Sequence, residues 1–168
     1  MNTLEQALLP DPTPEDANPA VRSGLVLVLA PHAARAQMLP LAARLALLGP
    51  LLVIDGGNRF NAYQVALHIR RQSAAHFKEA LERIRAARAF TPYQMLALLE
   101  ATLPLVESAP PNPAPILALD LLDTFYDESL PQAERRRLLV MCLAHLRRLS
   151  ATAAVARANP PNAPREAI

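Results

Sequence analysis

Five short apolar segments alternate with helical patterns along the chain. The segments are Gly24–Ala30, Pro50–Asp55, Ile84–Phe90, Ala114–Asp120 and Ala151–Ala158. The first, second and fourth are continuous apolar runs, which are typical of parallel strands that are buried on both faces. The third and fifth are rich in alanine and have a weaker strand pattern.

Between these segments, apolar residues recur at helical spacing. Helices are predicted over Ala34–Leu48, Ala62–Ile69, Ala74–Arg83, Pro92–Leu105 and Pro131–Leu149. The alternation of strand and helix predicts an α/β fold, a three-layer α/β/α sandwich around a mainly parallel five-stranded sheet. Functional residues are then expected at the carboxyl ends of the strands.

Composition predicts the bounds of the domain and the cellular compartment. The 168 residues suit one domain, and residues 23–158 are expected to form it, because many of the 17 prolines fall in segments 1–22 and 159–168. The net charge of +2 is too small to predict nucleic-acid binding by itself. The only cysteine, Cys142, lies in an apolar run and is predicted to be a buried thiol. With no signal peptide or membrane span expected, the prediction is a cytoplasmic protein.

The turn APHAARAQ, residues 30–37, follows the first strand, where many α/β proteins hold a phosphate. It contains no glycine, lysine, serine or threonine. His32 and Arg35 are candidate anion-binding residues, since a helix N-terminus favours negative charge. The alternative is a solvated turn.

Polar residues also follow the second strand. Asp55, Asn58 and Arg59 lie in the segment IDGGNRFN and are candidate ligand-binding residues. The alternative is a plain strand-to-helix turn that is capped by Asn58 or Asn61.

After the fourth strand, the acidic residues are Asp120, Asp123, Asp127 and Glu128. They are candidate ligands of a divalent cation, and the alternative is a solvated acidic loop. We expect Arg88, at the end of the third strand, to pair with Asp55 or Asp120. The histidines form no convincing catalytic arrangement with serine or cysteine, so no catalytic residue and no metal site is predicted.

Three segments in this order resemble one family. They are LVIDGGNRFNAYQVALHIRR, IRAARAFTPYQMLALLEA (Ile84–Ala101) and PILALDLLDTFYDESLPQAERRRLLVMCLAHLRRLS. They are similar to successive units of RecA-fold recombinases of the RadA type, which belong to the P-loop NTPase superfamily. The resemblance covers roughly Gly24 to Asn159, and it implies a RecA-like core with the sheet order 3-2-4-5-1.

The same resemblance implies a degenerate phosphate loop. The family's two glycines fall on Ala30 and Arg35, its lysine falls on Ala36, and its magnesium-binding hydroxyl falls on Gln37. The glutamate that activates water falls on Gly57, and only Asp120 keeps the family's residue type. Without the lysine, hydroxyl and base, phosphoryl transfer is not expected. We therefore expect a pseudo-ATPase with no ATP or magnesium cofactor.

These expectations leave surface recognition as the predicted function. The resemblance implies an accessory or regulatory protein in DNA repair or recombination, whose partner is a RecA-fold ATPase or a second copy of the chain. DNA binding is weakly supported, because the first DNA-binding loop would be short and acidic and the second would be the proline-rich tail. The alternatives are a nucleotide- or anion-binding module without hydrolysis, an inhibitor of the SulA type, and an enzyme of unrecognised chemistry.

Overall fold

The computed structural model describes residues 24–29, 37–108, 114–126, 128–152 and 154–159. The strands are β1 (Gly24–Leu29), β2 (Leu51–Asp55), β3 (Ile84–Arg88), β4 (Ile116–Leu119) and β5 (Ala154–Asn159). The helices are α3 (Met38–Leu48), α4 (Ala62–Gln72), α5 (Phe77–Glu82), α6 (Pro92–Glu107) and α7 (Gln132–Thr152), with a 3-10 helix η1 (Leu121–Tyr126). The expected terminal segments 1–22 and 159–168 lie outside the described residues, apart from Asn159, which ends β5.

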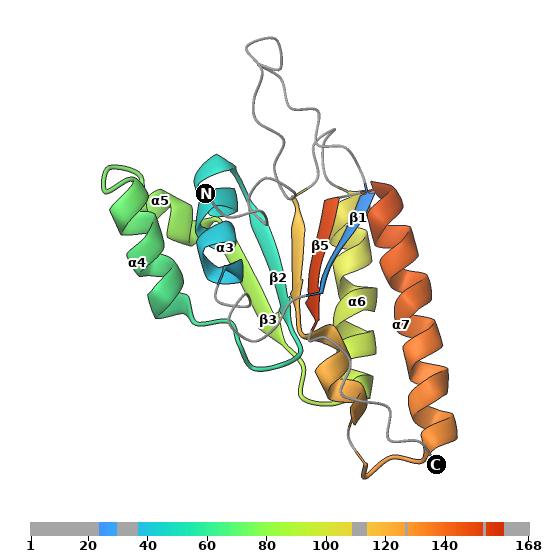
Figure 1. Cartoon of the computed structure of the whole chain (residues 1–168). Helices are drawn as coiled ribbons and strands as arrows, with labels where there is room; N and C mark the ends of the chain where they lie inside the picture. Colours follow the sequence, from blue (N-terminus) through green and yellow to red (C-terminus); the bar gives the residue numbers. More distant parts are fainter. Residues whose placement is uncertain (1–23, 30–36, 109–113, 127, 153, 160–168) are drawn as a thin grey trace.

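All strand pairs in the sheet are parallel. The order is β1-β5-β4-β2-β3, which from the β3 edge is the order 3-2-4-5-1 implied by the resemblance. Helices α3, α4 and α5 lie on one side of the sheet, and α6 and α7 lie on the other (Figure 1). Because the strands are parallel, their carboxyl ends share one edge, at the lower end of the molecule in Figure 1.

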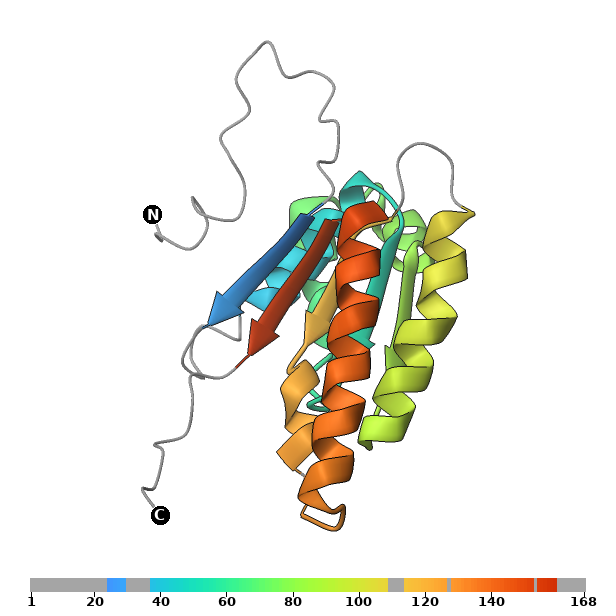
Figure 2. The same cartoon turned by 90° about the vertical axis from the view of Figure 1, so that its right-hand side faces the viewer.

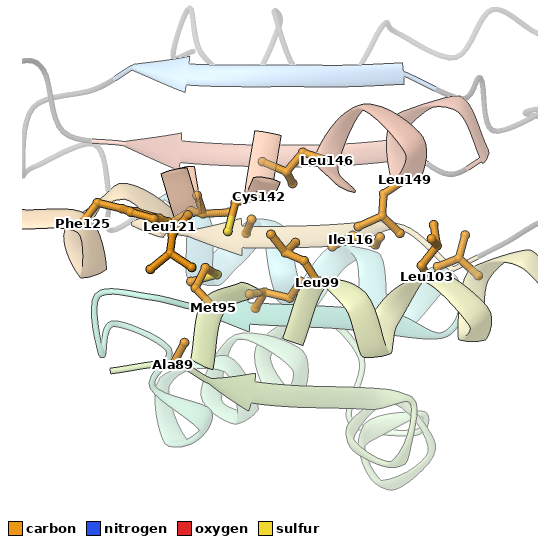
Figure 3. Close-up of a cluster of buried hydrophobic side chains, with 14 residues drawn as sticks. Ala89, Met95, Leu99, Leu103, Ile116, Leu121, Phe125, Cys142, Leu146 and Leu149 are labelled. Atoms are coloured by element: carbon orange, nitrogen blue, oxygen red, sulfur yellow. The ribbon is translucent and has the colours of Figure 1, made fainter. Parts of the chain in front are cut away.

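Two apolar clusters hold the layers together. The larger one lies between the sheet and α6, η1 and α7, and Figure 3 shows Met95 and Leu99 of α6 on the same side of the sheet as Cys142 and Leu146 of α7. The second joins α3, α4 and α5 to the opposite face. Strands β2 and β4 are buried along almost their whole length, as their continuous apolar runs predict.

The predicted fold class needs a correction in its packing. The predicted sandwich has helices on both faces of its sheet, whereas four of the five β3 residues are exposed. Burial is described for the three neighbouring strands β3, β2 and β4, and only β2 and β4 are well buried. Many more of the described residues lie in helices than in strands. The alanines and arginines of β3 explain this, since they offer a helix little apolar surface to bury. The chain is therefore a small α/β fold rather than an evenly covered RecA-like core.

Local sequence determines where two of the helices begin. The Thr91 side chain accepts a hydrogen bond from the Gln94 backbone at 3.2 Å, and Pro92 occupies the first helical position of α6. Of the two candidate caps before α4, Asn61 is the one that caps, because its side chain accepts from the Gln64 backbone at 3.1 Å. Both helices begin at the carboxyl edge of the sheet, and so both of their first turns lie beside the candidate site.

Candidate functional site

The polar residues at the carboxyl edge come from three adjacent strands. Asp55 ends β2, Arg88 ends β3, and Asp120 directly follows β4. The two aspartates are buried, with 1% and 2% of their surface exposed. The fold therefore brings together three of the residues that the sequence singles out.

Both carboxylate oxygens of Asp55 accept hydrogen bonds from groups of the same chain. Its Oδ1 accepts a hydrogen bond from the Arg59 backbone N–H at 2.9 Å. Its Oδ2 accepts from the Phe60 backbone N–H at 3.0 Å and from Arg88 Nε at 2.9 Å. Arg88 also donates to the Phe60 carbonyl at 3.1 Å, so one carboxylate holds the loop after β2 and the end of β3 together. This pair is one of the two that we expected for Arg88.

Asp120 lies in an unusual backbone conformation beside a second arginine. Its φ is 44°, in the left-handed region that few residues other than glycine, asparagine and aspartate adopt. Arg59 Nε lies 3.6 Å from Asp120 Oδ2, although half of the arginine side chain is exposed. Arg59 and Arg88 therefore both lie against carboxylates of the same chain.

The loop after β2 packs tightly on Asp120. A methyl group at Gly57 would lie 2.5 Å from Asp120 Cβ, 2.8 Å from Asp120 Oδ2 and 3.0 Å from Asp123 Oδ2. A methyl group at Gly56 would lie 2.8 Å from the Asp120 carbonyl oxygen. Position 57 thus has no room for a side chain unless Asp120 moves.

The remaining candidate residues are spread around this edge or lie outside the described residues. Asn58 is exposed with a φ of 53°, and it forms a turn rather than a cap. Gln37 directly precedes α3 and its side chain makes no capping hydrogen bond. Ala30, His32, Arg35, Ala36 and Asp127 lie outside the described residues. Within the described part of the chain, no group of three or more histidine, cysteine or acidic side chains is placed to hold a metal.

Exposed aromatic side chains lie at the same edge, and the sequence patterns above did not predict them. Tyr63 is 69% exposed in the first turn of α4, Phe90 is 64% exposed after β3, and Tyr126 is 60% exposed at the end of η1. Tyr93, in the first turn of α6, is 48% exposed. We call these four residues the aromatic edge. The chain has three tyrosines and four phenylalanines, so the aromatic edge includes every tyrosine.

A polar network ties the aromatic edge to α7. The Tyr93 hydroxyl donates to Glu134 Oε1 at 2.9 Å, and Arg137 donates to both oxygens of the same carboxylate at 2.6 and 2.8 Å. The hydrogen bonds from Arg137 and then from Tyr93 lower the pKa of Glu134 to about 2. The bond to Glu134 raises the pKa of Tyr93 above its ordinary value. Both groups therefore keep their charge states over the neutral range.

Cys142 and His145 could in principle take part in chemistry, but both lie in packing contacts between elements of the fold. Cys142 is completely buried in the larger apolar cluster, and this burial raises the pKa of its thiol to about 12. His145 Nε2 lies 3.6 Å from Glu100 Oε1, across the contact between α6 and α7. None of the described helices is long and apolar enough to span a membrane.

Comparison with known proteins adds no family to this description. No protein-family model matches the sequence, and a search of curated proteins finds no significant similarity.

Proposed function

We propose that this chain is a non-catalytic accessory protein that acts by binding another protein through the aromatic edge. The observation that carries the proposal is the exposure of Tyr63, Phe90, Tyr93 and Tyr126 at the carboxyl edge of the sheet. Open α/β sheets bind their ligands at this edge. Tyrosine and arginine are among the residue types most enriched at the energetic centres of protein interfaces.

The packing around Gly57 supports a function without phosphoryl transfer. A base that activates water must reach the reacting phosphate from this loop in the resembling family. Here Asp120 and Asp123 occupy the space that a side chain at position 57 needs. Asp55 accepts three hydrogen bonds from its own chain, so it is a structural carboxylate rather than a free base.

Charge pairing at this edge favours a protein partner over a free anion or a nucleic acid. Arg59 and Arg88 lie 3.6 Å and 2.9 Å from the carboxylates of Asp120 and Asp55. A phosphate would have to compete with Asp55 and Asp120 for these arginines. A protein partner can instead contact the exposed aromatic rings, whose apolar surface does not depend on charge. The exposed glutamate at position 128 would also repel a phosphate backbone.

The sequence resemblance supplies the proposed partner and process. A RecA-fold ATPase, or a second copy of this chain, is the proposed partner, in DNA repair or recombination in the cytoplasm. A chain that resembles such ATPases in sequence and lacks their phosphate-binding residues is suited to cap or support an assembly of active subunits.

Calorimetric titration of the purified chain tests the non-catalytic half of the proposal. We expect no heat of binding with ATP or ADP, with or without magnesium. Binding at micromolar affinity that Asp120→Ala abolishes would contradict the proposal and favour a nucleotide-binding module.

Surface substitutions test the binding half. The full chain is tagged and purified from its native cells, and the same purification is repeated with Phe90→Ser and with Tyr126→Ser. Leu48→Ser is the matched control, because Leu48 is 81% exposed but lies at the opposite edge of the sheet, just before β2. We expect both aromatic variants to lose a partner that the control retains. Equal recovery of that partner with all three variants would contradict the proposal.

A further inference from the structure

Helix α7 has two different long faces. Leu138, Cys142, Leu146 and Leu149 are buried against the sheet and α6. On the outward side, Arg136, Val140, Leu143 and Arg147 follow one another at spacings of four, three and four residues, and all four are exposed. Residues at this spacing form one continuous stripe along a helix. We call these four residues the outer stripe.

The outer stripe has an apolar centre that no described element covers. Val140 is 60% exposed and Leu143 is 39% exposed. In Figure 2, α7 faces the viewer, and no other described helix or strand lies over it. The exposed residues Ala133, Ala144 and Ala151 lie on the same side and are small enough for a second helix to approach closely.

Three of the five arginines of α7 have partners within the chain, and Arg135 donates to the Phe125 carbonyl at 3.5 Å. Arg137 binds Glu134 at 2.6 Å, and Arg148 lies 3.2 Å from Glu107 of α6. The side chains of Arg136 and Arg147, each the immediate neighbour of one of these, form no ion pair or hydrogen bond with any described residue. The two arginines that flank the apolar centre are therefore the ones left available to a partner.

We propose that the outer stripe docks an acidic amphipathic helix of a partner protein. The two arginines are eleven positions apart in the sequence, which places them about 16 Å apart along the helix. The complementary helix presents apolar side chains to Val140 and Leu143, and it carries carboxylates at a similar separation to meet the two arginines. Spacings of three and four residues on both helices allow the side chains to interdigitate.

Charge also argues against a second copy on the same stripe. In an antiparallel pair of α7 helices, Arg136 of one copy would face Arg147 of the other, and like charges at a contact are unfavourable. A partner helix with carboxylates removes this repulsion. The outer stripe is separate from the aromatic edge, so this inference does not rest on the proposed function.

Fluorescence anisotropy of the full chain with designed peptides tests the proposal. The probe is an amphipathic helical peptide with two glutamates about eleven positions apart and leucines between them, and its control has lysines in place of the glutamates. We expect the acidic peptide to bind at least about tenfold more tightly than the basic one, and its affinity to fall as salt is added. Equal affinity for the two peptides, or no binding of either, would overturn the proposal.

Neighbouring arginines give a matched pair of variants. Arg147→Glu should weaken binding of the acidic peptide about tenfold, whereas Arg148→Glu, whose native side chain is already paired with Glu107, should change it by less than about twofold. Circular dichroism of both variants verifies that the helix content is unchanged. An equal loss of affinity in the two variants would show that net charge, and not the outer stripe, determines peptide binding. That result would overturn the proposal.

A photo-crosslinking amino acid at position 143 distinguishes the occupants. In the full chain, the proposal expects an adduct with the acidic peptide and no adduct in its absence. A link to residues 1–22 of the same chain, or a covalent dimer, would show that the chain covers its own stripe and would overturn the proposal.

Discussion

Arg88 Nε donates to Asp55 Oδ2 at 2.9 Å, and the two residues are directly opposite each other in the register of β2 and β3. The ion pair joins the carboxyl end of the edge strand β3 to that of its neighbour β2. The aspartate is almost completely buried, while the arginine side chain is 38% exposed. The pair therefore lies on the buried side of the candidate site, and the exposed aromatic side chains form its outer surface.

Removing this carboxylate should destabilise the fold. Asp55→Ala leaves Arg88 and the backbone N–H groups of Arg59 and Phe60 without their acceptor. We expect the free energy of unfolding to fall by about 2–4 kcal/mol in urea denaturation. Glu82→Ala is the control, because its pair with Lys78 is exposed and should change stability by less than about 0.5 kcal/mol. Similar losses in the two variants would contradict the structural role of Asp55.

Two glycines in the chain should respond differently to a methyl group. Gly57→Ala places its Cβ 2.5 Å from Asp120 Cβ, and the resulting displacement should cost about 1–3 kcal/mol. Gly49→Ala meets no atom within 4 Å, and its backbone is extended, so its stability should stay within about 0.5 kcal/mol of the native chain. Chemical denaturation of both variants measures the difference. A neutral Gly57→Ala would show that the loop is not closed on Asp120.

The buried thiol should be inert in the folded chain. Burial raises the pKa of Cys142 to about 12, so iodoacetamide should label it at least about a hundredfold more slowly at pH 8 than it labels the unfolded chain. The unfolded thiol loses its proton near its ordinary pKa of about 8.5. The free energy of unfolding should therefore decrease as the pH rises from there towards 12. Rapid labelling under native conditions would contradict the burial.

The network around Glu134 should persist in acid. Because its pKa is lowered to about 2, Glu134 should titrate far below an ordinary glutamate in an NMR experiment. The stabilisation from this carboxylate is present above the unfolded pKa of about 4.3 and is lost as the pH falls through about 2. Arg137→Ala should raise the midpoint more than Tyr93→Phe, since Arg137 is the larger cause of the shift. A midpoint near that of an ordinary glutamate in the native chain would refute the network.

The spacing of residues along the sequence predicted the buried face of α7 and the start of α6. The intervals between Leu138, Cys142 and Leu146 predict the buried face of α7, and all three are at most 1% exposed. The helix predicted to begin at Pro92 is also confirmed, and Thr91 caps it. These features depend on residues within a few positions of one another, so one sequence is sufficient to find them.

Features that depend on long-range contacts were harder to predict. The sequence allowed Arg88 two partners, and the register of β2 against β3 determines that it pairs with Asp55. The alanines and arginines of β3 indicate a weak strand, but only the packing of the helices shows that four of its five residues are exposed. The aromatic edge did have a signal, because Phe90 and Tyr126 each follow closely on a strand end. The predicted site took its residues from the charged and polar positions at those strand ends and left the aromatic ones out.

Photo-crosslinking in the native cell tests whether the chain binds its partner through the aromatic edge. A photoreactive amino acid is placed at position 90 in one full-length variant and at position 48 in another, and the adducts are identified by mass spectrometry. We expect one defined protein adduct from position 90 and none of that protein from position 48. The same adducts from both positions, or none from position 90, would contradict this expectation.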